Sequence, residues 1–288
     1  MLWPGYPPPM EILMTPFRAV LCLVPLLVCL AARGSPPSAP DESPPPHRSV
    51  MLESVALKET RRINVYVPPG QPPGQPLPVI YMPDGGVAED FPHIANTIDA
   101  AIRAGRMAPV MLVGIENTQR RRDMTGPTEV EDDRKIAPVV GGSAAFRAFI
   151  ADELMQWVTA NYATTGQRGI IGESLAGLFI VETFFTMPEL FDTCIALDPS
   201  LWWNAGTLSK ESAAWLAGHP DMRGRLYVAW AEPETIGPNV ALLEAALQQA
   251  APQGLEWQIV ARPDLDHATI YRAVAPVVLP AMYPPRPQ

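Results

Sequence analysis

The segment Gly169–Gly177 constrains the fold of this chain more than any other stretch. It runs Gly-Ile-Ile-Gly-Glu-Ser-Leu-Ala-Gly and contains the pattern G-x-S-x-G centred on Ser174. A short apolar run precedes the pattern, and an apolar helical pattern from Leu178 to Met187 follows it. Glycines on either side of the serine remove the Cβ atoms that would collide in a sharp bend between a strand and a helix. The segment therefore predicts a strand–turn–helix unit that presents Ser174 as a candidate nucleophile.

An alternation of strand and helix patterns surrounds this unit. The expected strands are 51–57, 62–67, 77–82, 109–115, 168–171, 193–197, 225–230 and 256–261, the first two antiparallel. The expected helices are about 93–105, 142–162, 174–187, 237–250 and 267–275. Such alternation is typical of a mostly parallel sheet with helices on both faces. Together with the serine turn it predicts an α/β protein with the α/β-hydrolase fold, in which residues 199–224 shape a small cap.

A serine hydroxyl is a poor nucleophile at neutral pH and needs an adjacent base. The chain has four histidines. His47 lies in a proline-rich segment, His219 in a surface turn, and His93 near the loop that follows strand 77–82. His267 follows the last expected strand and opens the last helix, where a hydrolase with the chain order Ser, acid, His carries its base. We therefore expect His267 to be the base, with a surface histidine as the alternative.

The acid that would orient this imidazole has several candidates. In this fold it usually follows the second strand after the serine helix, which here ends at Trp230. Glu234 is the first choice and Glu232 the second. Asp198, at the end of the preceding strand, is a third position. The alternative is that all three carboxylates are solvated and that the serine and histidine act as a dyad.

Two backbone N–H groups are expected to form an oxyanion hole. One belongs to Leu175, directly after the nucleophile. The other is expected in the loop Pro83-Asp84-Gly85-Gly86, where two glycines let the backbone approach the substrate, and Gly86 is the preferred donor. A simple turn without a catalytic role is the alternative for this loop.

Composition excludes several other functions. The formal net charge of −9 argues against nucleic-acid binding, which needs clustered Lys and Arg. No two histidines have a spacing such as i, i+4 that would indicate a metallohydrolase. We expect a single folded domain over 49–288 that needs neither metal nor cofactor; the sequence pattern specifies no oligomeric state.

The N-terminal region resembles an export signal. Arg18 precedes the uncharged run Ala19–Ala32, which is shorter than the about 20 apolar residues that span a bilayer. Residues 1–33 are therefore predicted to be a signal peptide, with an uncleaved anchor as the alternative. Residues 34–48 are rich in proline and are predicted to be a disordered tether. The expected location is the periplasm or the extracellular space, without a stable membrane span in the mature chain.

Several segments together resemble one branch of the α/β-hydrolases, the "putative esterase" family, which includes enterobactin and salmochelin siderophore esterases and bacterial esterase D relatives. The matching segments are Tyr81–Gly86, Val113–Thr125 (with V-G-I-E-N-T-Q-R-R-R-D), Ile170–Gly177 and Pro199–Trp203 (P-S-L-W-W). The second and fourth are more specific than the serine motif, and the resemblance spans roughly 50–275. The chain departs from the family pattern at Asp198, where a serine is more frequent.

The resemblance implies hydrolysis of small-molecule carboxylic esters through an acyl-serine, with no metal or cofactor, and extends to catecholate trilactone siderophores. By matched position it assigns Ser174 and His267 to catalysis, and Gly86 and Leu175 to the oxyanion hole. It places Arg120 and Arg122 near the mouth of the site, to meet an anionic substrate or product; pairing with Asp123 and nearby acids is the alternative.

Trp202 and Trp203 would line the acyl pocket; the alternative is that they pack the cap over the edge of the sheet.

Two other functions stay open. One is acyl transfer to an alcohol by the same machinery, and the other is a non-catalytic binding protein on a hydrolase scaffold, against which the intact Ser174 and His267 argue.

Overall fold

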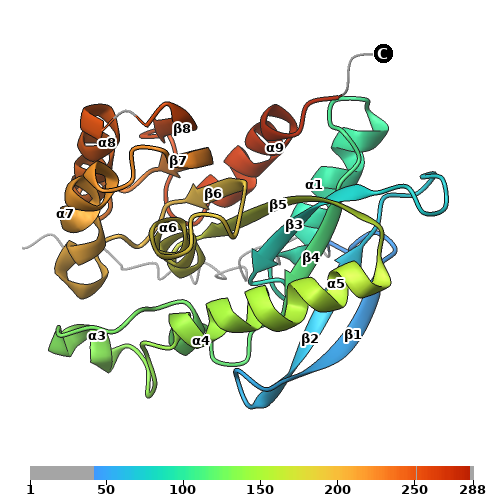
Figure 1. Ribbon diagram of the computed structural model, residues 1–288, viewed down its shortest axis with the longest axis horizontal. Coiled ribbons are helices and arrows are strands. Elements are labelled where there is room, and N and C mark those ends of the chain that lie inside the picture. The colour runs from blue at the N-terminus through green and yellow to red at the C-terminus, as the bar shows by residue number, and fades with distance from the viewer. Residues whose placement is uncertain (1–41, 251, 286–288) are drawn as a thin grey trace, which may run out of the picture. The chain divides into compact units, whose positions relative to one another are not determined.

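The computed structural model describes residues 42–250 and 252–285 (Figure 1). Its strands form one sheet with the order β1-β2-β4-β3-β5-β6-β7-β8. The strands are β1 (Arg48–Ser54), β2 (Glu59–Tyr66), β3 (Leu77–Pro83), β4 (Met111–Ile115), β5 (Thr164–Glu173), β6 (Thr193–Leu197), β7 (Arg223–Trp230) and β8 (Gly254–Ala261). Pairing of β1 with β2 and of β2 with β4 is antiparallel, and every later pairing is parallel. The predicted strands and the predicted antiparallel start of the sheet are confirmed.

The central strands are buried along their whole length. Every residue of β3, β4 and β6 is buried, as expected for parallel strands with helices on both faces. Successive side chains of a strand point to opposite faces. Thus Cys194 and Ala196 of β6 belong to one apolar core, and Ile195 and Leu197 belong to the other.

Helices cover both faces of the sheet. The core on one face includes α1 (Phe91–Arg103) and α9 (Ile270–Met282), which also contact each other. The core on the other face includes α4 (Ser143–Ala148), the π-helical segment η1 (Phe149–Leu154), α5 (Met155–Asn161), α6 (Leu175–Thr186), α7 (Trp203–Ala217) and α8 (Gly237–Ala250). Two short helices, α2 (Arg120–Asp123) and α3 (Glu131–Lys135), lie in the long connection after β4. The α/β-hydrolase architecture is confirmed, with the carboxyl ends of the parallel strands at one edge.

The region expected to be a small cap is different. Residues 203–217 are α7, which has a kink of left-handed backbone at Asn204, Ala205 and Gly206. It connects β6 to β7 and contacts α8 and α6. This segment is therefore a crossover helix of the covering layer. The sequence did not predict this helix because polar residues, such as the buried Ser209 and Ser212, occupy positions where an amphipathic helix usually carries apolar ones.

The predicted signal peptide, 1–33, lies outside the described residues, as does most of the predicted tether. Within the described part of that tether, Glu42 pairs with Arg272 of α9 and the Ser43 carbonyl accepts from Asn96 of α1. The rings of His47 and Phe91 pack edge to face, with their centroids 5.2 Å apart. Residues 42–48 therefore pack on the domain, and the prediction of a disordered segment is wrong for them. In the described part of the chain, no helix combines the length and the apolar character needed to cross a bilayer.

Candidate active site

Ser174 occupies a strained turn between β5 and α6. Its φ of 61° and ψ of −120° lie outside the regions that most residues adopt. Two backbone hydrogen bonds hold this turn: the Ser174 N–H donates to the Leu197 carbonyl, and the Ser200 N–H donates to the Ser174 carbonyl, each at 3.0 Å. A Cβ on Gly177 would lie 3.0 Å from Cα of Pro199. The glycine of the motif therefore permits the close approach that anchors the serine.

Ser174, His267 and Asp198 form one chain of hydrogen bonds. The Nε2 atom of His267 lies 3.1 Å from Oγ of Ser174, and its Nδ1 atom lies 2.5 Å from Oδ2 of Asp198. Oδ1 of Asp198 accepts from the Ala231 N–H at 2.8 Å, and the Asp198 side chain is fully buried. The three side chains therefore lie in the arrangement of a nucleophile, its base and the acid that orients the base.

The preferred acid, Glu234, is not part of this chain. It is exposed on the turn after β7, so the prediction that it contacts the histidine is wrong. The side chain of Glu232 contacts the backbone of His267 and not its ring: Oε1 of Glu232 accepts from the His267 backbone N–H at 3.2 Å. Asp198 takes the place because β6 is the immediate neighbour of β5, with Leu197 paired to Glu173. The residue after Leu197 therefore lies beside Ser174, whereas Glu234 follows a strand further away.

The carboxylates around the imidazole favour its protonated form. The hydrogen bond that His267 donates to Asp198 is the main cause that raises the pKa of His267, and the charge of Glu173 adds to it. Burial raises the pKa of the Glu173 carboxyl to about 7. The imidazolium that forms when Ser174 loses its proton is thus stabilised from two sides.

The two expected oxyanion donors differ in whether their N–H group is already hydrogen-bonded within the protein. Leu175 begins α6, so its N–H is among the first four of the helix, which have no partner within the helix. The Gly86 N–H, in contrast, donates to Oε2 of Glu89 at 2.7 Å. Oε1 of the same carboxylate accepts from the Asn117 N–H at 3.3 Å. The structure therefore places Gly86 in the expected loop with its N–H bonded to Glu89.

Both candidate arginines are committed to carboxylates. Arg120 makes a two-point contact with Asp84, at 2.6 Å from Nε and 2.8 Å from Nη2. Arg122 pairs with Glu59 and Asp123. Pairing within the protein, the alternative considered for these residues, is therefore what the structure shows.

The two tryptophans are divided between surface and interior. The Trp203 side chain is buried, and its Nε1–H donates to the Gly126 carbonyl at 3.0 Å. The Trp202 side chain is 36% exposed. Only Trp202 is therefore placed to meet a ligand from solvent.

Sequence reasoning missed two polar groups at the site. The Ser200 hydroxyl lies 3.4 Å from Oγ of Ser174 and is almost fully buried. Glu89 bonds the oxyanion loop as described above. Ser200 belongs to the P-S-L-W-W segment, so its position in a specific motif was an available signal; Glu89 lies in no such motif.

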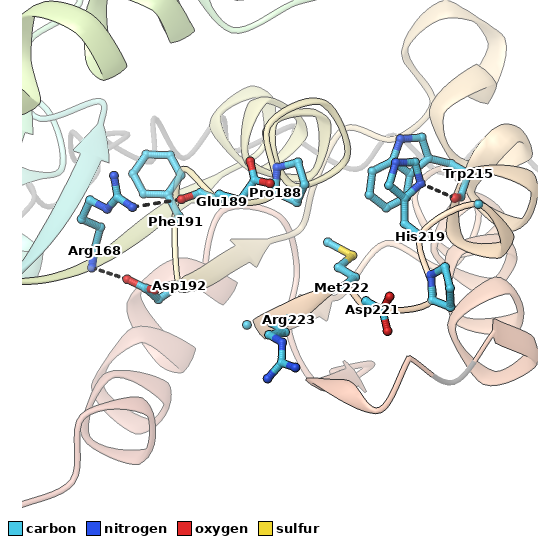
Figure 2. A pocket seen from close by; sticks show the side chains of 13 residues that line it. Arg168, Pro188, Glu189, Phe191, Asp192, Trp215, His219, Asp221, Met222 and Arg223 are labelled. Atoms are coloured by element: carbon cyan, nitrogen blue, oxygen red, sulfur yellow. Dashed lines mark hydrogen bonds between the residues drawn. The ribbon is translucent and has the colours of Figure 1, made fainter.

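A cavity of about 690 Å³ lies away from the catalytic residues, near the amino ends of β6 and β7 (Figure 2). Trp215 and His219 stack there with ring centroids 3.7 Å apart, and Nδ1 of His219 contacts the Trp215 carbonyl. The Arg168 guanidinium donates to the Glu189 carbonyl at 3.0 Å. Several polar groups that line this cavity thus form hydrogen bonds within the protein.

Within residues 42–250 and 252–285, no group of three His, Cys, Asp or Glu side chains could hold a metal ion.

Comparison with known proteins agrees with this geometry. The family model described as "Putative esterase" matches residues 54–231. The ferri-bacillibactin esterase BesA of Bacillus subtilis is 31% identical over 183 residues, which are 56% of this chain and 61% of that protein. The iron(III) salmochelin esterase of Escherichia coli is 25% identical over 186 residues, which are 60% of this chain and 42% of that protein. The chain therefore spans less than two thirds of the length of these relatives.

A solved structure shares the fold over most of both chains. The crystal structure of an IroE-like serine hydrolase from Shewanella oneidensis superposes with a TM-score of 0.72 and 25% sequence identity. The superposition covers 83% of this chain and 80% of that chain.

Proposed function

Because this chain belongs to the putative esterase family, we propose that it hydrolyses carboxylic esters through a covalent acyl-enzyme on Ser174. The observation that carries the proposal is the continuous contact from Oγ of Ser174 through His267 to the buried Asp198. Family membership supports ester chemistry, and this contact supplies the groups that such chemistry needs.

The proposed reaction has two halves. Oγ of Ser174 attacks the ester carbonyl carbon while its proton moves to Nε2 of His267. The carbon–oxygen bond to the alcohol then breaks, and His267 returns the proton to the departing alkoxide. Water then attacks the acyl-serine and gives a proton to His267. The bond from the acyl carbon to Oγ breaks, His267 passes the proton to Oγ of Ser174, and the carboxylic acid leaves. Asp198 holds the imidazole with Nε2 facing Ser174 throughout.

Backbone N–H groups would stabilise the tetrahedral oxyanion. The Leu175 N–H, at the start of α6, also profits from the positive end of the helix dipole. The Gly86 N–H can serve as the second donor when the Glu89 carboxylate leaves it.

The proposed physiological substrates are esters of the siderophore class, trilactones included. The support is the resemblance to the relatives named above, whose printed names refer to ferri-bacillibactin and iron(III) salmochelin. We propose further that residues 1–33 export the protein to the periplasm or the medium, which the amino-terminal sequence of the mature protein would test.

Burst kinetics test the proposed chemistry. Wild-type protein is mixed with p-nitrophenyl acetate and butyrate beside Ser174→Ala and His267→Ala. A burst of p-nitrophenol followed by turnover, lost in both variants, is the expected result. Full activity in Ser174→Ala would refute the nucleophile assignment. Ester products formed with an added alcohol would indicate acyl transfer. A silent wild type that a fluorophosphonate does not label would instead indicate a binding protein.

A further inference from the structure

The turn after β6 packs against the turn that carries Ser174. It begins at Asp198, whose φ of 44° is a left-handed backbone that Asp adopts more readily than most residues. The Ser200 N–H donates to the Ser174 carbonyl at 3.0 Å, and the Ser200 carbonyl accepts from the Trp203 N–H at 3.1 Å. Both backbone polar groups of Ser200 are therefore bonded, which holds its side chain beside the nucleophile.

The Ser200 hydroxyl points at the reacting atom. Its oxygen lies 3.4 Å from Oγ of Ser174, and the residue is only 2% exposed. Among the described residues, Oγ of Ser174 is the one hydrogen-bond partner of this hydroxyl. Buried polar groups are normally hydrogen-bonded, and the two halves of the proposed reaction do not use this one.

The chain of hydrogen bonds fixes which of the two serines donates. Asp198 accepts from Nδ1 of His267 at 2.5 Å, so the neutral imidazole carries its proton on Nδ1 and Nε2 is an acceptor. Ser174 has one hydroxyl proton, and this proton goes to Nε2 at 3.1 Å. The contact between the two serines therefore uses the proton of Ser200 and a lone pair on Oγ of Ser174.

A donor at this position acts on the charge that develops during catalysis. Oγ of Ser174 becomes negative as its proton moves to His267, and again when the bond from the acyl carbon to Oγ breaks. A hydrogen bond to an ionised oxygen is shorter and about twice as strong as one to a neutral oxygen. The contact of 3.4 Å has room to shorten, as catalytic hydrogen bonds do in the loaded site. An interaction that is stronger in the transition state than in the ground state lowers the barrier.

We propose that Ser200 is a catalytic residue whose hydroxyl donates to Oγ of Ser174 and stabilises the negative charge on that atom in both halves of the reaction. The turn after β6 thus supplies two groups: Asp198 orients the base, and Ser200 stabilises the nucleophile. The inference rests on the proposed acyl-serine chemistry and adds a fourth side chain to it.

Two reactions of Ser174 test this role. Hydrolysis of p-nitrophenyl butyrate gives kcat/KM, which reports formation of the acyl-enzyme. Labelling by a fluorophosphonate gives a second-order rate constant for the attack alone: Oγ bonds to phosphorus, fluoride leaves, and the proton of Ser174 passes to His267. Both are measured for wild type, Ser200→Ala and Ser200→Thr.

Ser200→Ala should lower both rate constants about tenfold or more, the low end of the effect of a hydrogen bond to a charged group. The two factors should agree, because both reactions begin with the attack of Oγ. Ser200→Thr keeps a hydroxyl on the same Cβ and should stay within about threefold of wild type.

The matched control is Ser212→Ala in α7. Ser212 is another buried serine, 1% exposed, and its hydroxyl donates to the Ser209 carbonyl at 2.7 Å. Because this hydroxyl does not contact Ser174, both rate constants of Ser212→Ala should stay within about twofold of wild type. Thermal unfolding shows that each variant is folded at the assay temperature.

The pH–rate profile separates a direct role from a displaced turn. The contact with Asp198 raises the pKa of His267, and Ser200→Ala leaves this contact in place if the turn is intact. We therefore expect Ser200→Ala to lower the plateau of kcat/KM without moving the midpoint. A midpoint that falls together with the plateau would show that the loss comes through Asp198, and it would overturn the inference.

Two further results would overturn it. One is a Ser200→Ala protein that stays within about threefold of wild type in both reactions, and the other is a Ser200→Thr protein as slow as Ser200→Ala. Failure of the proposed function is distinguishable. A wild type that is labelled by the fluorophosphonate but hydrolyses no ester refutes ester hydrolysis, while the labelling rates still test Ser200. Labelling of Ser200→Ala at the wild-type rate refutes the role of Ser200 and leaves ester hydrolysis standing.

Discussion

Replacing Asp198 with Asn tests how the histidine is held. The buried carboxylate accepts from Nδ1 of His267 at 2.5 Å and from the Ala231 N–H at 2.8 Å. Asn has nearly the same shape, and its carbonyl oxygen can still accept from Ala231. Its NH₂ group then faces Nδ1 and donates to it. The imidazole must therefore carry its proton on Nε2, the wrong atom for accepting the proton of Ser174.

The expected loss combines two effects. A hydrogen bond to a charged group contributes about 1.5–3 kcal/mol, or about 10- to 150-fold in rate. Fixing the wrong tautomer brings the total loss in kcat to about 10⁴-fold in a related triad. We therefore expect Asp198→Asn to lower kcat/KM for p-nitrophenyl butyrate by about 10³-fold or more, with a melting temperature within a few degrees of wild type.

Glu234→Gln is the matched control, since it removes a carboxylate from the exposed turn that sequence reasoning preferred. Its activity should stay within about twofold of wild type, as is usual for surface changes. Steady-state kcat/KM values of both variants show which carboxylate is the acid. If Asp198→Asn kept more than a tenth of the activity, or if Glu234→Gln lost more than Asp198→Asn, the assignment of the acid would be refuted.

Three further predictions concern pH and stability. The rise of kcat/KM with pH should have its midpoint above 6.5, because the hydrogen bond donated to Asp198 raises the pKa of His267 and only neutral imidazole can accept a proton; a pH–rate profile with the midpoint below 6.5 would contradict this. Gly172→Ala should lower the free energy of unfolding by about 1–3 kcal/mol in urea, since the new Cβ would lie 2.6 Å from Cβ of Ala176; an unchanged urea midpoint would disprove the clash. Arg61→Met should lower the free energy of unfolding by about 3 kcal/mol, because the fully buried guanidinium pairs with Glu59 and the buried Asp123, and Arg122 would remain as their cation; a loss below 1 kcal/mol would show that Arg122 alone compensates both carboxylates.

The positions of the strands along the chain and the candidate serine and histidine were predictable because each depends on local pattern. The fully apolar runs of β3, β4 and β6 indicate buried parallel strands, and the G-x-S-x-G turn follows the apolar end of β5. The identity of the acid depends on a different property, namely which strand lies next to β5. That adjacency is a feature of the sheet order, and without it Asp198 ranked below Glu234 and Glu232, which follow the strand that usually carries the acid.

The roles of charged side chains were harder to predict for the same reason. Arg120 and Arg122 lie in a specific motif, but their partners Asp84 and Glu59 come from distant segments. Likewise Glu89 bonds the Gly86 N–H only because the loop after β3 folds back on itself. Residues 42–48 resembled a linker in composition, yet Glu42 and His47 find partners on α9 and α1 that a composition argument cannot supply.

The central claim is that Ser174 carries the acyl group, and intact-mass spectrometry tests it most directly. The protein is quenched in acid within the burst phase of p-nitrophenyl butyrate hydrolysis, and the adduct is located by peptide mapping. We expect one butyryl group per chain, on the peptide that contains Ser174, and none in Ser174→Ala. An adduct on another residue, or a burst that persists in Ser174→Ala, would contradict it.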